Sequence, residues 1–366
     1  MVDSAAHPRT QGLDDAHAQL RLSSGPTAVP VFLGDFGTAL AGVVRVDSWN
    51  HLPQGEGGPD AGAHTAVLRS YWDNGGGYCY LANTAGTALE QTLIDLEHYP
   101  DVTILVPLEL WGQGAEAAAS TARAVVAYAA DHEAMAVLHA ARDHSPQQAQ
   151  QAVEDFALEP GKRSHAALYH PWLSHPDNAE EPVPPVGAVT GIWHRVDTER
   201  GVWKAPANIA VAGGWQLGRQ VSDQGQSEAR SVNFLREFPG RGTLVWGTRT
   251  LEEPGSDFVY IPVRRLTDTV YRTLYQGMRA VAFDPNTEDT WARVRSATER
   301  YLHDLWEQGA LMGSRQEEAY SVRIGHGTTM SDDEVKAGWI VLEVGLAALR
   351  PAEFRVVKVV GEAQPA

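Results

Sequence analysis

Three histidines at a regular spacing are the first candidates for chemistry in this sequence. His165, His170 and His175 recur every five residues, and the imidazole nitrogen is a common ligand of zinc. A spacing of five puts these side chains on one face of neither a helix nor a strand, and no acidic or cysteine cluster accompanies them. The His-Pro pairs at 170–171 and 175–176 are typical of turns. The sequence therefore predicts no metal site.

Motifs for hydrolysis or phosphate binding are missing as well. The chain has no Gly-x-Ser-x-Gly motif, which holds the nucleophile of many hydrolases, and no glycine-rich loop ending in Lys-Ser or Lys-Thr. Glu109 follows an apolar run, at a place where α/β enzymes often carry functional groups, but a structural or interface role for it is favoured. We predict no catalytic residue and no cofactor, and an α/β hydrolase is the alternative function.

The composition restricts the partners that this chain would bind. Its 366 residues include 29 Lys and Arg against 46 Asp and Glu, a net charge of −17. Such an excess argues against nucleic acid and against anionic membranes, and no apolar run reaches the roughly 18 residues of a membrane helix. Met1–Gly25 lacks the pattern of a secretory signal. Cys79 is the single cysteine, so no disulfide framework is expected and synthesis in a reducing bacterial cytoplasm is favoured.

The middle of the chain alternates between strand and helix patterns. The apolar run at 102–107 predicts a buried strand, and 134–140 and 165–169 predict two further strands. Residues 115–132 and 146–156 between them predict helices. This alternation is typical of parallel strands joined by helical crossovers, which gives a layered α/β core. The stretch Asp177–Gly187, rich in proline and acidic residues, is expected to be a linker or an exposed loop.

A hairpin and two long helices are predicted after the core. Two strand-like runs, 232–236 and 243–251, flank a Pro-Gly turn. The region from Tyr260 begins the last domain, with one helix ending near Arg279 and another over 288–308. One stripe of the second helix is expected to be buried, formed by Trp291, Val294, Thr298, Tyr301, Leu302 and Leu305.

The end of the chain carries a valine-rich strand behind Pro351. An unprotected strand edge attracts pairing with another chain, so this strand is predicted to pair between subunits. The residues of this C-terminal arm are Phe354, Val356, Val357, Lys358, Val359 and Val360.

The beginning of the chain shows a weaker strand pattern. Residues 16–23 alternate between apolar and polar side chains, which favours a strand, although Leu13, Ala16 and Leu20 also fit a short helix. We expect this segment to precede the first compact unit as an arm. The apolar positions of this N-terminal arm are Ala16, Ala18, Leu20 and Leu22.

Several stretches of the sequence resemble contractile tail sheath proteins, the outer sleeve of myophage tails, R-type pyocins and related contractile injection systems. They cover most of residues 65–360 in the order of that family. The most specific is Pro184–Asn208, with its Arg-Gly-Val-Trp-Lys-Ala-Pro-Ala-Asn ending. The others are Ser70–Tyr80, Asn233–Leu251, Tyr260–Gly313, which resembles the family's Tyr-Ile-x-Val-Arg-Arg strand and helical pair, and Gly338–Phe354. The Pro-Gly-Val-Tyr-Ile-Glu-Glu arm that opens many sheaths is missing.

The resemblance implies a fold and a mode of assembly. The fold would be a subtilisin-like, non-catalytic α/β core with a smaller α+β C-terminal domain and extended terminal arms that add strands to neighbouring subunits. The implied divisions are an N-terminal arm (1–25), a core (26–240), a C-terminal sheath domain (241–350) and a C-terminal arm (351–366). A helix of the C-terminal domain would face an inner tube, and on this sequence it maps onto 289–308, with Arg293, Arg300, Asp304 and Glu307 as its charged residues.

The resemblance also implies a structural function. The chain would form a helical homopolymer around an inner tube protein, with baseplate and terminal cap proteins at its ends and with room for a paralogous sheath protein. Contraction of this sleeve would drive the tube through a target envelope. The chain would belong to a phage tail or tail-like particle, without membrane insertion. Besides the hydrolase, a remaining alternative is an interaction protein that uses the fold outside any contractile machine.

Overall fold

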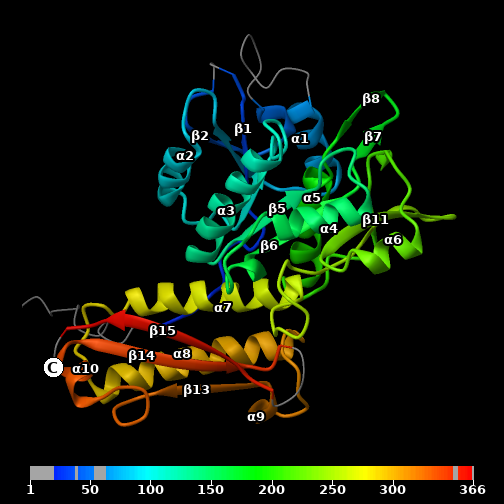
Figure 1. The fold of residues 1–366 in the computed structure, drawn as a ribbon. Coiled ribbons are helices and arrows are strands. Elements are labelled where there is room, and N and C mark those ends of the chain that lie inside the picture. Colours follow the sequence, from blue (N-terminus) through cyan, green and yellow to red (C-terminus); the bar gives the residue numbers. More distant parts are fainter. Residues whose placement is uncertain (1–19, 38–39, 53–62, 349–352, 365–366) are drawn as a thin grey trace, which may run out of the picture.

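The computed structural model describes residues 20–37, 40–52, 63–348 and 353–364, which form an α/β core and a smaller C-terminal unit (Figure 1). The core is built on a nine-stranded sheet in the order β2-β3-β1-β4-β5-β6-β11-β12-β9. Strands β3, β1, β4, β5, β6 and β11 pair in parallel, and the outer pairs are antiparallel. The strands are β1 (Pro30–Gly34), β2 (Val43–Val46), β3 (Cys79–Asn83), β4 (Ile104–Pro107), β5 (Met135–His139), β6 (Ala166–His170), β9 (Ile209–Ala210), β11 (Val232–Phe238) and β12 (Gly242–Trp246).

Helices cover both faces of this sheet. On one face lie α1 (Ala63–Asp73) and α5 (Val186–Arg200), and on the other α2 (Leu89–Asp95), α3 (Ala115–Asp131) and α4 (Pro146–Asp155). Strands β4 and β5 are buried along their whole length because both of their faces are covered, which explains why they are apolar except for His139 at the end of β5. The layered α/β core predicted from the sequence is therefore confirmed.

Two glycines bring α5 against α1. A Cβ atom added at Gly187 would lie 2.1 Å from the backbone oxygen of Val67, and one at Gly191 would lie 2.2 Å from that of Tyr71. The two backbones are thus in contact, and α5 becomes the most buried helix of the core.

Two sequence expectations for the core need correction. The stretch expected to be a linker or loop holds β8 (Asn178–Val183) and the start of α5, and β8 joins β7 (Leu173–His175) and β10 (Gln216–Leu217) in a small sheet. The helix α6 (Asp223–Glu228) follows. The hairpin of β11 and β12 belongs to the core sheet, so the expected domain boundary at residue 241 lies inside it. Its β12 strand pairs along its length, which keeps the core continuous to residue 246.

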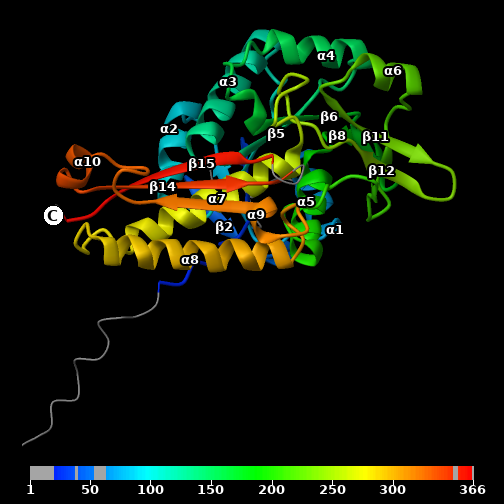
Figure 2. The ribbon, with the colours of Figure 1, turned by 90° about the horizontal axis from the view of Figure 1, so that it is seen from below.

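The C-terminal unit is a three-stranded antiparallel sheet with helices packed on one face (Figures 1 and 2). The strand order is β13-β14-β15. The long helix α7 runs between this sheet and the core, and α8 lies beside it under the sheet. The elements are α7 (Ile261–Arg279), α8 (Glu288–Glu307), α9 (Gln316–Ala319), β13 (Tyr320–Ile324), α10 (Asp332–Lys336), β14 (Trp339–Leu346) and β15 (Arg355–Glu362).

The sequence predicted the two long helices well. All six residues of the expected stripe on α8 are buried. The segment that resembles a Tyr-Ile-x-Val-Arg-Arg strand, however, is the first turn of α7, where Pro262 fits because proline lacks only a donor that the first turn leaves unused. None of the described helices combines the length and apolar character needed to cross a membrane.

Candidate assembly surfaces

The last strand of the chain is part of the C-terminal sheet. Strand β15 pairs with β14 of the same chain at eight positions, from Arg355 opposite Leu346 to Glu362 opposite Trp339. Val357 and Val359 point into the core of the unit, whereas Val356 is 70% exposed. The strand predicted as a C-terminal arm therefore has a partner within its own subunit, and its alternating pattern reflects one buried face and one open face.

The sheet keeps two open edges. Within the described ranges, β15 pairs with a strand on one side only, and so does β13 at the opposite edge. Beyond β15 the edge is closed briefly, because the Gln364 amide donates to the Asp284 carbonyl at 3.1 Å and the Gln364 carbonyl accepts from the Asn286 amide at 3.2 Å. Unpaired backbone groups along an edge are a template for another chain.

Large apolar side chains are exposed beside the β15 edge. Phe283 is 84% exposed, and Trp339 and Tyr275 are each almost half exposed. Tyr275, Trp339 and Val360 line a shallow groove of about 370 Å³. Exposed aromatic groups of this size next to an open strand edge mark a surface suited to contact with protein.

The start of the described chain lies on α7 and α8 instead of in a sheet. Residues 20–29 form no strand in the single chain, and Leu20 and Leu22 pack against the C-terminal core. Arg300 donates to the Leu20 carbonyl at 3.1 Å. Ala16 and Ala18, the other two residues of the predicted N-terminal arm, lie outside the described residues.

The four charged residues predicted to face a tube lie along α8. Three of them have a polar partner within the chain: Arg293 pairs with Asp284 at 2.8 Å, Arg300 binds the Leu20 carbonyl, and Glu307 lies 3.5 Å from His303. Asp304 lines the groove that holds Leu22. The structure therefore brings Arg300 and Asp304 next to the N-terminal segment.

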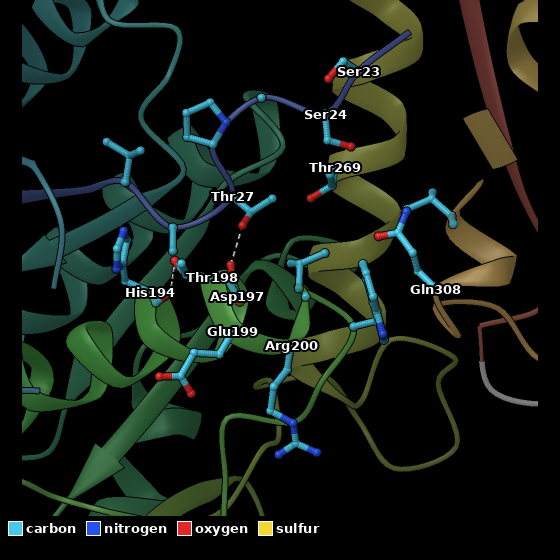
Figure 3. A pocket seen from close by; sticks show the side chains of 18 of the residues that line it. Ser23, Ser24, Thr27, His194, Asp197, Thr198, Glu199, Arg200, Thr269 and Gln308 are labelled. Carbon is cyan, nitrogen blue, oxygen red and sulfur yellow. Dashed lines mark hydrogen bonds between the residues drawn. The ribbon is translucent and has the colours of Figure 1, made fainter. Parts of the chain in front are cut away.

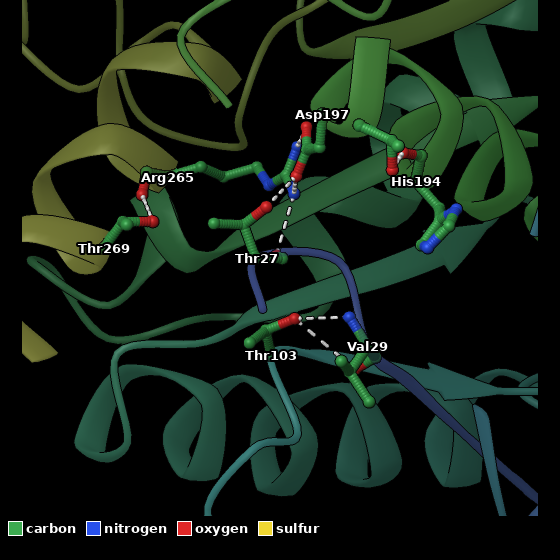
Figure 4. A network of polar contacts seen from close by, with 8 residues as sticks. Thr27, Val29, Thr103, His194, Asp197, Arg265 and Thr269 are labelled. Atoms are coloured by element: carbon green, nitrogen blue, oxygen red, sulfur yellow. Dashed lines mark hydrogen bonds and ion pairs between the residues drawn. The ribbon is translucent and has the colours of Figure 1, made fainter. Parts of the chain in front are cut away.

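The surface between the two units is ionic, which sequence reasoning missed. Helix α7 turns an apolar stripe toward the C-terminal core, formed by Leu266, Val270, Leu274 and Met278. Its other side carries charged residues toward the α/β core. There Arg265 forms two hydrogen bonds with Asp197 of α5, at 3.0 and 2.6 Å (Figure 4). Its guanidinium also lies over the ring of Trp193. Both charged side chains are at most 5% exposed.

A second ionic cluster lies farther along α7. Asp268 pairs with Arg264 at 2.5 Å, and His165 of the core lies 3.7 Å from its other carboxylate oxygen. Burial lowers the pKa of His165. Burial, followed by the charge of Asp268, raises the pKa of Glu133 to about 7. The sequence shows only that these residues carry charge. It does not show that they meet, because they come from separate elements.

This cluster predicts a pH dependence of stability. Glu133 faces the acids Asp268 and Asp131 and the bases Arg264 and Arg272. Because its folded-state pKa lies above its ordinary value of 4.5, the folded chain binds more protons between pH 4.5 and 7, and stability falls as pH rises through 7.

We expect Glu133→Gln to raise the melting temperature at pH 8 more than at pH 5.5. The difference should correspond to about 1–2 kcal/mol, allowing for partial solvent screening at this half-buried site. Thermal unfolding at both pH values checks this. The lowered pKa of His165 makes stability fall on acidification, which is opposite to the effect of Glu133. The variant is therefore compared with wild type at each pH. Equal shifts at both pH values would contradict the assignment.

The candidate chemical groups of the sequence are held in separate places. His165 bonds to the Ala134 carbonyl and His175 to that of Gly213, whereas the buried ring of His170 contacts no hydrogen-bonding partner. Among the described residues, no group of three or more His, Cys, Asp and Glu side chains could hold a metal ion. Glu109 accepts from the Asp35 amide and lies 3.5 Å from His64.

Comparisons with known proteins agree on one kind of relative. A family model for the phage tail sheath C-terminal domain matches residues 253–360. The contracted sheath complex of PVC, an extracellular contractile injection system, is 35% identical to this chain, with a TM-score of 0.79. The match covers 98% of this chain and 97% of the PVC chain. The contracted helical sheath of the anti-feeding prophage is 32% identical over 97% of this chain and 99% of its own, with a TM-score of 0.77.

A more distant protein shares the fold. A sheath tail protein of Listeria innocua is 9% identical over 94% of this chain and 97% of its own, with a TM-score of 0.66. No curated protein matches the sequence.

Proposed function

This chain belongs to the contractile tail sheath family, and we propose that it polymerises around an inner tube by exchanging β-strands between subunits. It is a structural sheath subunit of a contractile injection system, with relatives of 30–35% identity over nearly the whole chain. The observation that supports strand exchange is the C-terminal sheet: among the strands that the structure describes, both of its edges are unpaired, and the last strand β15 forms one of them.

Exchange of β15 would replace the contacts between β15 and β14 of one subunit with the same contacts between two subunits. A neighbour's β15 would pair with β14 in the register that the chain's own strand uses here, so the number of ladder hydrogen bonds would stay the same. Each bond contributes about 0.5–1.5 kcal/mol net, so pulling an exchanged strand away from β14 without replacing it would cost several kcal/mol. Such links would hold subunits together while their bodies rotate during contraction.

The N-terminal arm would contribute from residues before Leu20. Leu20 and Leu22 were predicted as arm residues, but both pack on their own subunit. Any strand given to a neighbour would therefore lie in the preceding segment, which includes Ala16 and Ala18.

The tube would be contacted through α8. This proposal rests on the exposed carboxylate of Glu307 on α8, a helix of the C-terminal unit (Figure 1). We further propose that the chain has a structural role without catalysis. Its partners would be a tube and a baseplate, and it would be part of a tail-like particle. Related structures are described as sheath and baseplate assemblies.

A cysteine pair tests the exchange directly. Glu343 and Lys358 face each other across β14 and β15, and Cβ atoms at such positions lie within reach of a disulfide. Cys79 is buried and should not interfere. The double variant Glu343→Cys/Lys358→Cys is assembled under reducing conditions, oxidised, and run on a non-reducing denaturing gel.

Strand exchange predicts a ladder of covalent multimers on this gel. The matched control is Arg323→Cys/Glu343→Cys, which keeps one cysteine and pairs it across the β13–β14 hairpin, so it should give only monomer. Sheath tubes that yield only monomer from the first variant would show that β15 stays in its own subunit.

A further inference from the structure

The first described residues of the chain form a strap that crosses both units. We define the strap as residues Leu20–Thr27. The strap contacts α8, where Ser24 and Tyr301 share a hydrogen bond of 2.7 Å between their hydroxyl groups. It ends at α5, where Thr27 donates to Asp197 (Figure 3). The chain then enters β1 at the centre of the core sheet. The strap is therefore the only covalent route from the N-terminal arm into the folded body.

One end of the strap sits on a glycine of α7. A Cβ atom added at Gly277 would lie 2.2 Å from a terminal methyl group of Leu22. Gly277 lies within α7, where glycine weakens a helix relative to alanine. Because Gly277 has no side chain, it leaves a small depression on α7 that the Leu22 side chain fills. We call this depression the Gly277 seat.

The other end of the strap is held by a buried ion pair. Arg265 donates to the Thr27 carbonyl at 3.0 Å while it binds Asp197, and the hydroxyl of Thr27 donates to the same carboxylate (Figure 4). Next along the chain, the Val29 amide donates to the Thr103 hydroxyl at 2.8 Å. Charge-assisted hydrogen bonds away from water are strong, so this end is fixed.

Two grooves flank the strap. One of about 820 Å³ runs beside residues 22–29, and another of about 600 Å³ lies beside Leu20 and Leu22. The strap is thus held at a few sites instead of along a continuous packed surface. Removing the contacts at one of these sites should loosen the part of the chain on its N-terminal side and leave the rest of the fold in place.

We propose that the Leu22 side chain in the Gly277 seat is the anchor that holds the N-terminal arm to its own subunit when a neighbour pulls on that arm. This inference rests on the proposed function, because an arm carries load only if it is shared between subunits. Gly277 and Leu22 are positioning residues in this role. They fix the point from which the arm leaves the subunit.

Two variants disturb the anchor from opposite sides. Gly277→Leu fills the seat with a side chain that Leu22 cannot avoid, and Leu22→Ser removes the side chain that occupies the seat. Gly277→Ala is the control for the helix, since rotation of the flexible tip of Leu22 can make room for one methyl group. Arg21, which is exposed, offers a trypsin site inside the strap.

The first measurement uses the unassembled chain and does not depend on its function. We expect trypsin to cut after Arg21 about tenfold faster in Gly277→Leu and Leu22→Ser, because cleavage follows the population of the released strap. Gly277→Ala should be cut within about twofold of the wild-type rate. Wild-type rates in both disturbed variants would overturn the anchor, whether or not the chain forms sheaths.

The second measurement is tube formation, observed by negative-stain electron microscopy. We expect both disturbed variants to lose tubes or to give short ones, and Gly277→Ala to form tubes of normal length. Melting temperatures show that the variants are folded, and Leu22→Ser serves if Gly277→Leu is not. Normal tubes from a variant whose strap is released would overturn the anchor role and leave the sheath function standing.

Discussion

Deletion of residues 353–366 is expected to unfold the C-terminal unit and to abolish tube formation. The deletion removes all of β15, including the ladder with β14 and the buried side chains of Val357 and Val359. Ladder bonds and burial together amount to on the order of 10 kcal/mol, which is comparable to the whole folding free energy of a domain. Circular dichroism, melting curves and electron microscopy of the truncated chain measure the loss.

A peptide added in trans separates the two roles of β15. From the sequence alone, the truncated body would be expected to stay folded and only to fail in polymerisation, but the buried valines change this expectation. A peptide of residues 353–364 should restore folding if it can occupy the place beside β14. Lys358→Ser, at an exposed position of the strand, is the control and should have little effect. A truncated chain that melts like wild type would contradict the structural role of β15.

The second large effect is expected for Asp197→Ala. This substitution leaves the Arg265 guanidinium, 3% exposed, without its carboxylate partner at the surface between the two units. Removing one member of a buried ion pair typically costs about 3–5 kcal/mol, because the remaining charge is desolvated without compensation. Thr27 loses its partner in the same step, so the strap should loosen as well. We expect a melting temperature lower by several degrees.

Two controls identify the cause of this loss. Asp47→Ala breaks the Arg45–Asp47 pair, whose side chains are at least half exposed, and should cost at most about 1 kcal/mol. The double variant Asp197→Leu/Arg265→Met replaces the buried charges with apolar groups and should recover much of the stability. If Asp197→Ala melts like Asp47→Ala, the pair does not hold the two units together.

An ionic surface between the units suits a subunit that has to move as one body. The Arg265–Asp197 pair joins α7 to α5 and favours one relative orientation of the units, because charged groups out of water tolerate little displacement from their partners. An apolar surface of similar size would allow sliding at lower cost.

The sequence by itself determined the elements that depend on local pattern. The apolar runs at 104–107 and 135–138 belong to parallel strands with both faces covered, and the stripe on α8 from Trp291 to Leu305 is a buried helix face. The resemblance of several stretches to sheath proteins also pointed to the family. These features repeat over a few residues, so neighbours in sequence specify them.

The tertiary structure alone decided which distant residues meet. Asp197 and Arg265 are 68 positions apart, Thr27 and Asp197 are 170 apart, and nothing in their local sequence distinguishes them from exposed charged or polar residues. The partner of β15 was likewise undetermined, because a valine-rich strand can pair with its own subunit or with another. The reason is physical: pairing and burial depend on the path of the whole chain, whereas periodicity records only which face of an element is apolar.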